Sequence, residues 1–262
     1  MQYYFHNAVT EKPQISDFKL HNHDVYELLL FISGDAEYVV EGTTHKVEPY
    51  DLLIARPNEM HRIKHLSQTP YVRFVLNISD EFFLSYCPEY KIFFESDKYA
   101  YNKIESEFVK KSGILDSYTR LKKYTCDFTI KNSPIIPAVI TEIMYILCSC
   151  GDIYEQTTGC NTLIQNIISY INNNYKNKIS LEEIANKNFI SKYYMCRLFK
   201  EKTGYTLTSY INHKRIINVK DLCKNGISIS NAAIESGFGN YSAFYKAYVK
   251  EFGAAPKTLL EE

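Results

Sequence analysis

Apolar residues in the C-terminal part of the chain recur at helical spacing in two segments of the same design. Residues 181–202 hold a short amphipathic pattern, a turn, and a second pattern with apolar positions at Met195, Leu198 and Phe199. Residues 229–252 repeat this plan, with Phe244, Ala247 and Tyr248 as the corresponding positions. Residues three and four apart share one face of an α-helix, so each pattern predicts a helix with one buried side.

A polar residue that can cap a helix precedes each of the four predicted helices: Ser180, Ser191, Ser228 and Asn240. Serine and asparagine at this position accept a hydrogen bond from a free backbone N–H of the first turn. The turns between the helices are expected at 187–190 and at Gly237-Phe238-Gly239. Two short helices joined by a tight turn form a helix-turn-helix, whose second helix enters the major groove of DNA.

One longer helix is predicted between the two copies, from Thr208 to Cys223. This stretch contains no proline or glycine, and Gly204 and Gly226 lie just beyond its ends. A helix of this length spans roughly 25 Å at about 1.5 Å per residue. Together with the two modules it is long enough to place both second helices in successive major-groove segments, about 34 Å apart.

This C-terminal region resembles the DNA-binding domain of the AraC/XylS family of bacterial transcription regulators. The resemblance rests on Ile179–Ala185, Ser191–Gly204, the Tyr210 to Arg215 spacing, Glu235–Phe238 and Gly253–Pro256. It implies two helix-turn-helix modules on one all-α domain that binds double-stranded DNA and activates transcription by contact with RNA polymerase, although repression is also common. The positions that the resemblance assigns to base contacts are Lys192, Tyr193, Cys196 and Arg197 in the first module, and Tyr241, Ser242, Tyr245 and Lys246 in the second. Lys200 extends the exposed basic stripe of the first module.

Charge separates the two parts of the chain, although the net charge of the whole is zero. Residues 161–262 carry 14 Lys and Arg against 8 Asp and Glu, and the remaining residues carry 16 against 22. A basic C-terminal part suits the neutralisation of phosphates. An acidic N-terminal part does not suit contact with DNA, so we expect it to perform another task.

Short β-prone runs fill the N-terminal part, and turn residues such as Ser33-Gly34-Asp35 and Glu48-Pro49 separate them. Several short strands without helices between them indicate a sandwich or barrel. The predicted strands are Tyr26–Ile32, Ala36–Glu41, His45–Val47, Asp51–Ala55 and Tyr71–Ile78.

His21-x-His23-x3-Glu27-x6-Gly34 and Pro57-Asn-Glu-Met-His61 resemble the two cupin motifs, which implies a cupin-like β-barrel, the usual sensor domain of sugar-responsive AraC-type regulators. Three imidazoles and a carboxylate are ligands for a divalent transition metal. Two departures weaken the metal interpretation, since Ile15 and Glu59 stand where the motifs have glycine. We therefore favour a metal-free pocket for an organic effector, lined by His21, His23, Glu27, Tyr38 and His61, and expect no cofactor; the same histidines and Glu27 are the candidate ligands if a metal binds.

After residue 80 the pattern becomes helical, with predicted helices at Glu81–Tyr86, Ile92–Glu95, Tyr101–Lys111, Ser117–Ile130 and Ile135–Cys148. The last of these has an apolar face too broad to be left in water. Two explanations remain open: a helix pair at the two-fold interface of a homodimer, or packing against the chain's own barrel.

These observations predict a multi-domain protein: a cupin-like effector-binding and dimerisation domain with accessory helices at 1–150, a linker at 151–160, and the DNA-binding domain at 161–262. No leader is evident in Met1–Gln14 and no run of about 18 apolar residues occurs, so we expect a cytoplasmic protein without membrane contact. The predicted function is a transcription regulator, not an enzyme, controlled by a sugar or sugar derivative. The alternatives are a metal-dependent cupin enzyme fused to a DNA-binding domain and a regulator that needs no effector.

Overall fold

The structure is a computed structural model that describes residues 2–14, 20–95, 102–126, 133–149 and 163–256. Its contacts divide the chain into two compact units, Met1–Val40 with Thr44–Cys160, and Glu41–Thr43 with Asn161–Glu262. The expected linker at 151–160, Ile15 and the end of the helix predicted to reach Ile130 lie outside the described residues.

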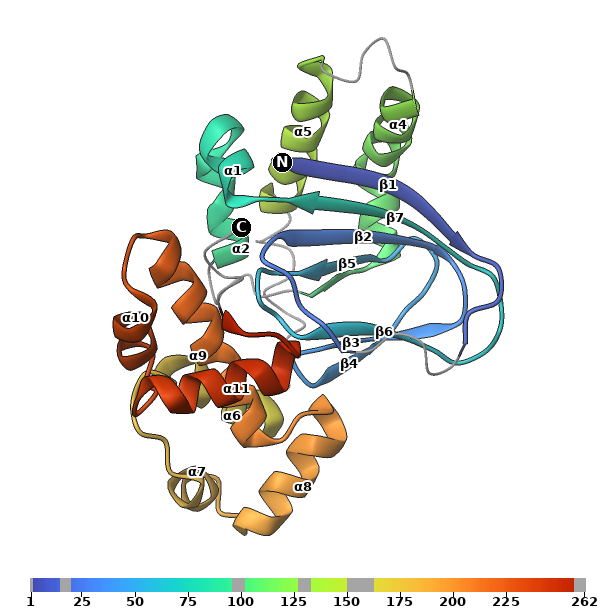
Figure 1. Cartoon of the computed structure of the whole chain (residues 1–262). Helices are drawn as coiled ribbons and strands as arrows, with labels where there is room; N and C mark the ends of the chain where they lie inside the picture. Colours follow the sequence, from blue (N-terminus) through green and yellow to red (C-terminus); the bar gives the residue numbers. More distant parts are fainter. Residues whose placement is uncertain (1, 15–19, 96–101, 127–132, 150–162, 257–262) are drawn as a thin grey trace. The chain divides into compact units, whose positions relative to one another are not determined.

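The described strands of the first unit form two sheets. The five-stranded sheet has the order β1 (Tyr3–Thr10), β7 (Tyr71–Ile78), β2 (Tyr26–Ser33), β5 (Leu52–Ala55) and β8 (Lys103–Ile104). The three-stranded sheet has the order β4 (Thr43–Lys46), β3 (Ala36–Val40) and β6 (His61–His65) (Figure 1). The sheet-rich fold is as predicted, but among these strands hydrogen bonding does not close into a barrel. The edge strand β8 has two residues, and among the described strands it pairs only with β5.

Strand β2 is buried on both faces. Its side chains alternate between two cores: Leu28 and Leu30 face the helices of the unit, and Leu29 and Phe31 belong to the core that also contains residues of β3 and β6. Successive side chains of a strand point to opposite faces, so an uninterrupted apolar run is the pattern expected of a central strand with material on both sides.

Three strands of this unit were not predicted from the sequence. In β6, the side chains at alternate positions that face inward are His61, Ile63 and His65, so the strand lacks the apolar alternation that marks a sheet. Strand β1 buries only Phe5. The expected helix Tyr101–Lys111 is wrong in its first half, because Lys103 and Ile104 pair with β5 and helix α3 (Ser106–Lys111) begins only after them.

Short helices follow the sheets: α1 (Asp80–Tyr86), the 3-10 turn η1 (Pro88–Lys91), α2 (Ile92–Glu95), α4 (Ile114–Cys126) and α5 (Ile135–Ser149). The six apolar residues that made α5 a candidate dimer helix are all buried inside their own unit: Ile136, Val139, Ile140, Ile143, Met144 and Leu147. The Tyr118 hydroxyl of α4 donates to the backbone carbonyl of Leu28, 3.0 Å away, and so ties the helices to β2. Of the two explanations for α5, the structure has the second, packing on its own domain.

The second unit is helical, as predicted. It contains α6 (Leu163–Asn174), α7 (Leu181–Lys187), α8 (Lys192–Thr203), α9 (Leu207–Lys224), α10 (Ile229–Glu235) and α11 (Tyr241–Phe252). All four predicted caps are confirmed. Ser180, Ser191, Ser228 and Asn240 each accept a hydrogen bond from the backbone N–H three residues later. None of the helices in the described part of the chain combines the length and apolarity needed to cross a membrane.

Candidate DNA interface and ligand cluster

The turns of the two helix-turn-helix modules have the same hydrogen bonds. After α7, the N–H groups of Phe189 and Ile190 donate to carbonyls three and five residues earlier, and after α10 those of Gly237 and Phe238 do the same. Both turns contain one left-handed residue, Phe189 with φ 55° and Gly237 with φ 93°. This is the arrangement of a Schellman-type helix end, which reverses the chain sharply.

The two left-handed residues have opposite surroundings. A Cβ atom at Gly237 would lie 2.6 Å from the carbonyl oxygen of Lys176 and 2.8 Å from that of Tyr175. Phe189, in contrast, is 96% exposed. The second turn is thus packed against backbone, and the first is open to solvent.

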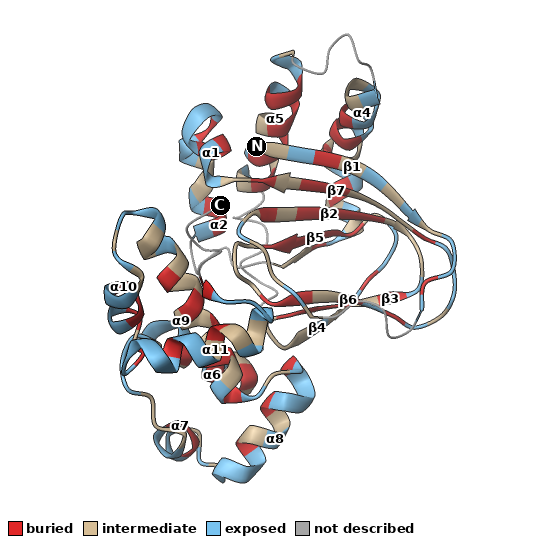
Figure 2. Ribbon diagram, viewed as in Figure 1, coloured by how far each residue is buried: buried red, intermediate tan, exposed pale blue. Residues whose placement is uncertain are grey.

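Helix α8 presents the predicted stripe of the first module to solvent. Met195 and Phe199 are buried and fix its orientation, whereas Lys192, Tyr193, Arg197 and Lys200 are exposed (Figure 2). Tyr193 is 78% exposed, so its ring is accessible to a partner. Cys196 alone of the predicted residues on this helix is half-buried.

Two charged groups on α8, Lys192 and Arg197, interact with neighbouring side chains. The Lys192 ammonium lies 2.5 Å from the Glu182 carboxylate, and this hydrogen bond raises the pKa of Lys192 and lowers that of Glu182. The Arg197 guanidinium lies 5.9 Å from the centre of the Tyr194 ring. Tyr194, which is 41% exposed, was not singled out from the sequence; its place three residues before Arg197 on the same helix was the available signal.

Helix α11 carries the second predicted group. Phe244 and Tyr248 are buried, and the four predicted contact residues are all exposed: Tyr241, Ser242, Tyr245 and Lys246. The Tyr241 and Tyr245 rings lie side by side with centroids 6.3 Å apart. Among the predicted contacts, the second module therefore offers an aromatic pair, one serine and one cation, and the first offers three cations, one tyrosine and the half-buried Cys196.

Helix α9 connects the two modules. Its 18 residues span about 27 Å at 1.5 Å per residue. Tyr210 near its start packs edge-on against Phe199 of the first module, and Ile216 and Val219 belong to the core of the second. One rigid element thus carries both modules.

Residues 175–177, which precede α7, are connected by hydrogen bonds to α9. The Arg215 side chain of α9 donates to the carbonyls of Tyr175 and Asn177, at 2.7 and 2.8 Å, and the Tyr175 hydroxyl donates to the Asn218 amide oxygen at 3.1 Å. The same segment supplies the carbonyls that contact Gly237. Residues 175–177 therefore form part of the second module's packing.

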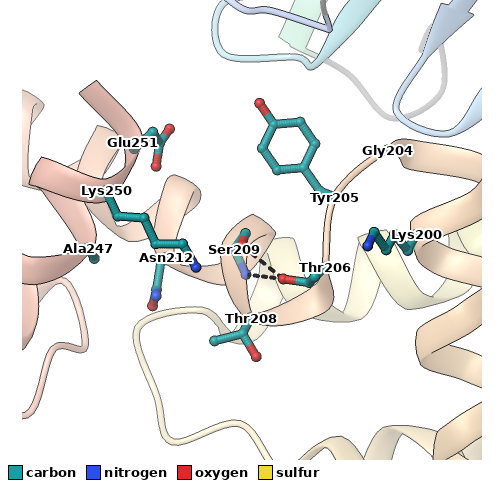
Figure 3. A pocket seen from close by; sticks show the side chains of 10 residues that line it. All are labelled: Lys200, Gly204, Tyr205, Thr206, Thr208, Ser209, Asn212, Ala247, Lys250 and Glu251. Carbon is teal, nitrogen blue, oxygen red and sulfur yellow. Dashed lines mark hydrogen bonds between the residues drawn. The ribbon is translucent and has the colours of Figure 1, made fainter. Parts of the chain in front are cut away.

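A hollow of about 400 Å³ lies in this unit among the end of α8, the start of α9 and the end of α11 (Figure 3). Lys200 and Lys250 line it together with Thr206 and Ser209, whose hydroxyls are 2.8 Å apart. Polar and apolar surface contribute about equally to its lining. Lys200, a predicted DNA contact, thus also borders this hollow.

In the first unit, three of the motif residues come together between the sheets. Glu27 lies on β2, on the same face as Leu29 and Phe31, and His61 begins β6 on the other sheet; His23 precedes β2. His23 Nε2 lies 3.4 Å from one Glu27 carboxylate oxygen, and His61 Nε2 lies 3.7 Å from the other. The possible ligand atoms of the three residues all lie within 4.8 Å of one another.

Backbone hydrogen bonds fix the segments that carry the histidines. His21 and His61 exchange two backbone hydrogen bonds, at 3.0 and 2.9 Å, and the N–H of Asn58 donates to the carbonyl of His23 at 2.8 Å. Glu59, which departs from the motif's glycine, accepts from the backbone N–H of Arg56 and from the Asn102 amide. The departure at Glu59 therefore tightens the turn instead of disrupting it.

Burial and the Glu27 carboxylate have opposing effects on the pKa of each of the two histidines, and the net shift differs between them. Burial lowers the pKa of His61 to about 4, against a smaller opposing effect of Glu27. Burial also acts to lower the pKa of His23, but hydrogen bonding and attraction to Glu27 outweigh it, and the pKa is raised. The pKa of Glu27 is lowered, because the opposing effect of burial is exceeded by the nearby imidazoles.

The other two predicted lining residues, His21 and Tyr38, lie near the His61 ring. The His21 ring lies 4.5 Å from the His61 ring and 6.2 Å from the His23 ring, centre to centre. Tyr38 is buried, with its ring 6.4 Å from that of His61, and its hydroxyl donates to the carbonyl of Ile54 at 3.0 Å. Burial raises the pKa of Tyr38 well above its usual value, so the hydroxyl keeps its proton.

Comparison with known proteins gives two family matches, one for each part of the chain. Residues 10–104 match the AraC-like ligand binding domain, and residues 184–262 match a helix-turn-helix domain. The chain belongs to the AraC/XylS family. This regulator therefore combines a DNA-binding helix-turn-helix domain with a domain of the ligand-binding type.

The curated relatives match this regulator along most of its length. The HTH-type transcriptional activator RhaS of Yersinia pestis bv. Antiqua (strain Angola) is 20% identical over 273 residues, covering 96% of this chain and 92% of RhaS. RhaS of Mannheimia succiniciproducens is 22% identical over 250 residues, covering 92% and 89%. Among solved structures, ToxT from Vibrio cholerae is 16% identical and covers 100% of this chain and 98% of its own, with a TM-score of 0.41. That likeness is too loose to transfer the role of any residue.

Proposed function

We propose that this regulator binds operator DNA through both helix-turn-helix modules and activates transcription under the control of a small organic effector. The observation that carries the DNA part is the pair of capped, exposed helices, α8 and α11, joined by the single helix α9. The N-terminal turns of both helices carry side chains able to reach base edges in the major groove. The proposed contacts are Lys192, Tyr193, Cys196, Arg197 and Lys200 on α8, and Tyr241, Ser242, Tyr245 and Lys246 on α11.

The effector part of the proposal uses the first unit. A sugar or sugar derivative would bind against His21, His23, Glu27, Tyr38 and His61, and its preference for one arrangement of the chain would change how the modules engage DNA. The match to the AraC-like ligand binding domain supports an effector, and the relatives named RhaS are activators. Activation would proceed by contact with RNA polymerase.

A homodimer is part of the same proposal, although the six apolar residues predicted for its interface on α5 are buried within their own unit. Other apolar side chains of this unit are exposed: Leu84 on α1, Ile92 on α2 and Tyr145 on α5. Sedimentation of the full chain at micromolar concentration tests this part. A dimer is expected, and a monomer would remove it without affecting the DNA part.

The test of the DNA part is selection of binding sites from a random pool by the full chain, followed by titration of the selected duplex at several salt concentrations. We expect a site with two half-sites about one helical turn apart, and a steep loss of affinity with salt. Binding without sequence preference would contradict the proposal.

The test of the effector part is a thermal-shift screen of the full chain with sugars and sugar phosphates. A ligand of the folded protein increases the free energy of unfolding by RT ln(1 + [L]/Kd) and so raises the melting temperature. The matched variant is Glu27→Gln, in which a true effector of this site should lose most of its shift. An effector that shifts both proteins equally would bind elsewhere.

A further inference from the structure

The two lysines that border the hollow between α8, α9 and α11 continue the stripes of the two helices proposed to read DNA. Lys200 follows Cys196 and Arg197 by four and three residues on α8, and Lys250 follows Lys246 by four on α11. Residues three or four apart share one face of a helix. The hollow of about 400 Å³ therefore lies where the two stripes end.

Positive charge exceeds negative charge in the lining of this hollow. Lys200 and Lys250 are exposed, and neither forms an ion pair with another residue that the structure describes. The one carboxylate in the described lining belongs to Glu251, and it accepts a hydrogen bond from Nδ1 of the buried His213. Both ammonium groups therefore remain available to an anion that enters the hollow.

The first turn of the 18-residue helix α9 adds hydrogen-bond donors to the same lining (Figure 3). Thr206 caps the helix by accepting from the N–H of Ser209 at 3.1 Å. The N–H groups of Leu207 and Thr208 come before this one, where an α-helix offers no carbonyl partner, and the aligned peptide dipoles place partial positive charge at this end. Ammonium groups, hydroxyls and backbone N–H groups together are the donors that bind phosphate oxygens in protein–DNA complexes.

A duplex that occupies both stripes brings its backbone to the hollow. On one face of B-DNA the minor groove, bordered by phosphates of both strands, lies between successive major-groove segments. We infer that the hollow binds a backbone phosphate located between the two half-sites of the operator, held by Lys200, Lys250 and the first N–H groups of α9. This inference rests on the proposed function. Such a contact carries no sequence information, but it fixes the register of both reading helices on the duplex.

A free phosphorylated ligand offers the same chemistry as a phosphate of DNA. Its binding would not require the two lysines to continue the stripes of α8 and α11, whereas a duplex lying along both stripes meets both lysines at once. The position of Lys200 and Lys250 therefore favours DNA as the source of the phosphate.

The first measurement is the salt dependence of DNA binding by Lys250→Gln in the full chain, on the selected operator and on a random duplex. Each phosphate contact contributes about 0.9 to the slope of log affinity against log salt concentration. We expect the slope to fall by about 1, and the affinity by about 5- to 10-fold on both duplexes, because the contact is independent of sequence. Lys200→Gln should lower the slope in the same way.

The matched control is Lys202→Gln, which removes an exposed cation of α8 that does not line the hollow. Its slope and affinity should stay close to those of the unaltered chain, and circular dichroism shows that each variant is folded. An unchanged slope in folded Lys250→Gln would overturn the inference.

The second measurement locates the phosphate on the operator. A series of duplexes carries one uncharged methylphosphonate each, at successive positions between the half-sites. One or two of them should weaken binding by the unaltered chain, and the same duplexes should weaken binding by Lys250→Gln much less, because the variant has already lost the contact. Equal losses in both proteins, or no sensitive position between the half-sites, would contradict the assignment.

The third measurement separates DNA from a free ligand. Isothermal titration of the DNA-free full chain with inorganic phosphate and with glucose 6-phosphate should show no saturable binding that depends on Lys250. Saturable binding that is lost in Lys250→Gln would assign the hollow to a free phosphorylated ligand instead. Failure of the proposed function would differ from both results: the chain would bind DNA without sequence preference, while the slope on the random duplex would still report the phosphate contact.

Discussion

The turns of the two helix-turn-helix modules meet the same backbone requirement with very different residues. Each needs one left-handed residue two positions after its first helix. The second module has Gly237 there, pressed against the carbonyls of Tyr175 and Lys176, and the first has Phe189 in open solvent. Hydrogen bonding sets the conformation in both turns, but only packing dictates that the residue be glycine.

The same contrast extends to the surfaces that face DNA. Among the predicted DNA contacts, the first module has three cations and the second an aromatic pair with one cation. We therefore expect the first to depend more on charge and guanine recognition, and the second more on contact with apolar base edges such as the thymine methyl.

The largest expected effect is that of Gly237→Ala. A methyl group would overlap two backbone oxygens, and the residue would also have to keep a left-handed conformation. We expect the free energy of unfolding of the helical unit to fall by about 3 kcal/mol. Gly226→Ala is the matched control, since its φ of 84° is similar and nothing lies within 4 Å of its added Cβ. Equal losses in urea denaturation followed by circular dichroism would mean that packing contributes nothing.

Arg197→Ala should have the next largest effect, on binding. Loss of a bidentate contact to guanine costs roughly 1 to 3 kcal/mol on the operator and little on random DNA. Anisotropy titrations on both duplexes measure it, with Lys202→Ala, an exposed cation on another face of α8, as the control. If both duplexes lose affinity equally, Arg197 contacts phosphate and does not read a base.

Tyr241→Ala should weaken only the half-site bound by the second module, by about 1 kcal/mol. Footprinting on the selected operator separates the two half-sites. Ile234→Ala removes an exposed side chain from α10 of the same module and should leave the footprint intact. An unchanged footprint in Tyr241→Ala would show that the second module does not read bases there.

Phe189→Gly should have the smallest effect and the opposite sign. A left-handed residue with a Cβ lowers the unfolding free energy by about 1–2 kcal/mol. Glycine removes this cost, but its greater conformational freedom in the unfolded chain offsets part of the gain. The expected net gain is about 0.5 kcal/mol of unfolding free energy, measured as for Gly237→Ala, with operator affinity unchanged. A loss of affinity would instead assign the exposed ring to the DNA surface.

The helical part was predictable because its signals are local. Ser191 caps its helix and Met195 faces inward for reasons contained in a few neighbouring residues. The burial of α5 was not predictable, because one apolar face suits a partner copy and the chain's own sheet equally well. In the cluster between the sheets, the motif predicted His23, Glu27 and His61. It did not predict that His23 Nδ1 and His61 Nδ1 donate to the carbonyls of Val25 and Glu59, because every residue has a backbone carbonyl and the sequence does not show which one a side chain contacts.

The hydrogen bonds from Arg215 to the carbonyls of Tyr175 and Asn177 limit where the chain can be truncated without loss of stability. The helix-turn-helix match begins at residue 184. A fragment that begins there would lack both carbonyl acceptors of Arg215 and the backbone of residues 175 and 176 against which Gly237 packs. An expression fragment meant to fold alone should begin before Tyr175, and a fragment that begins after Asn177 should be less stable.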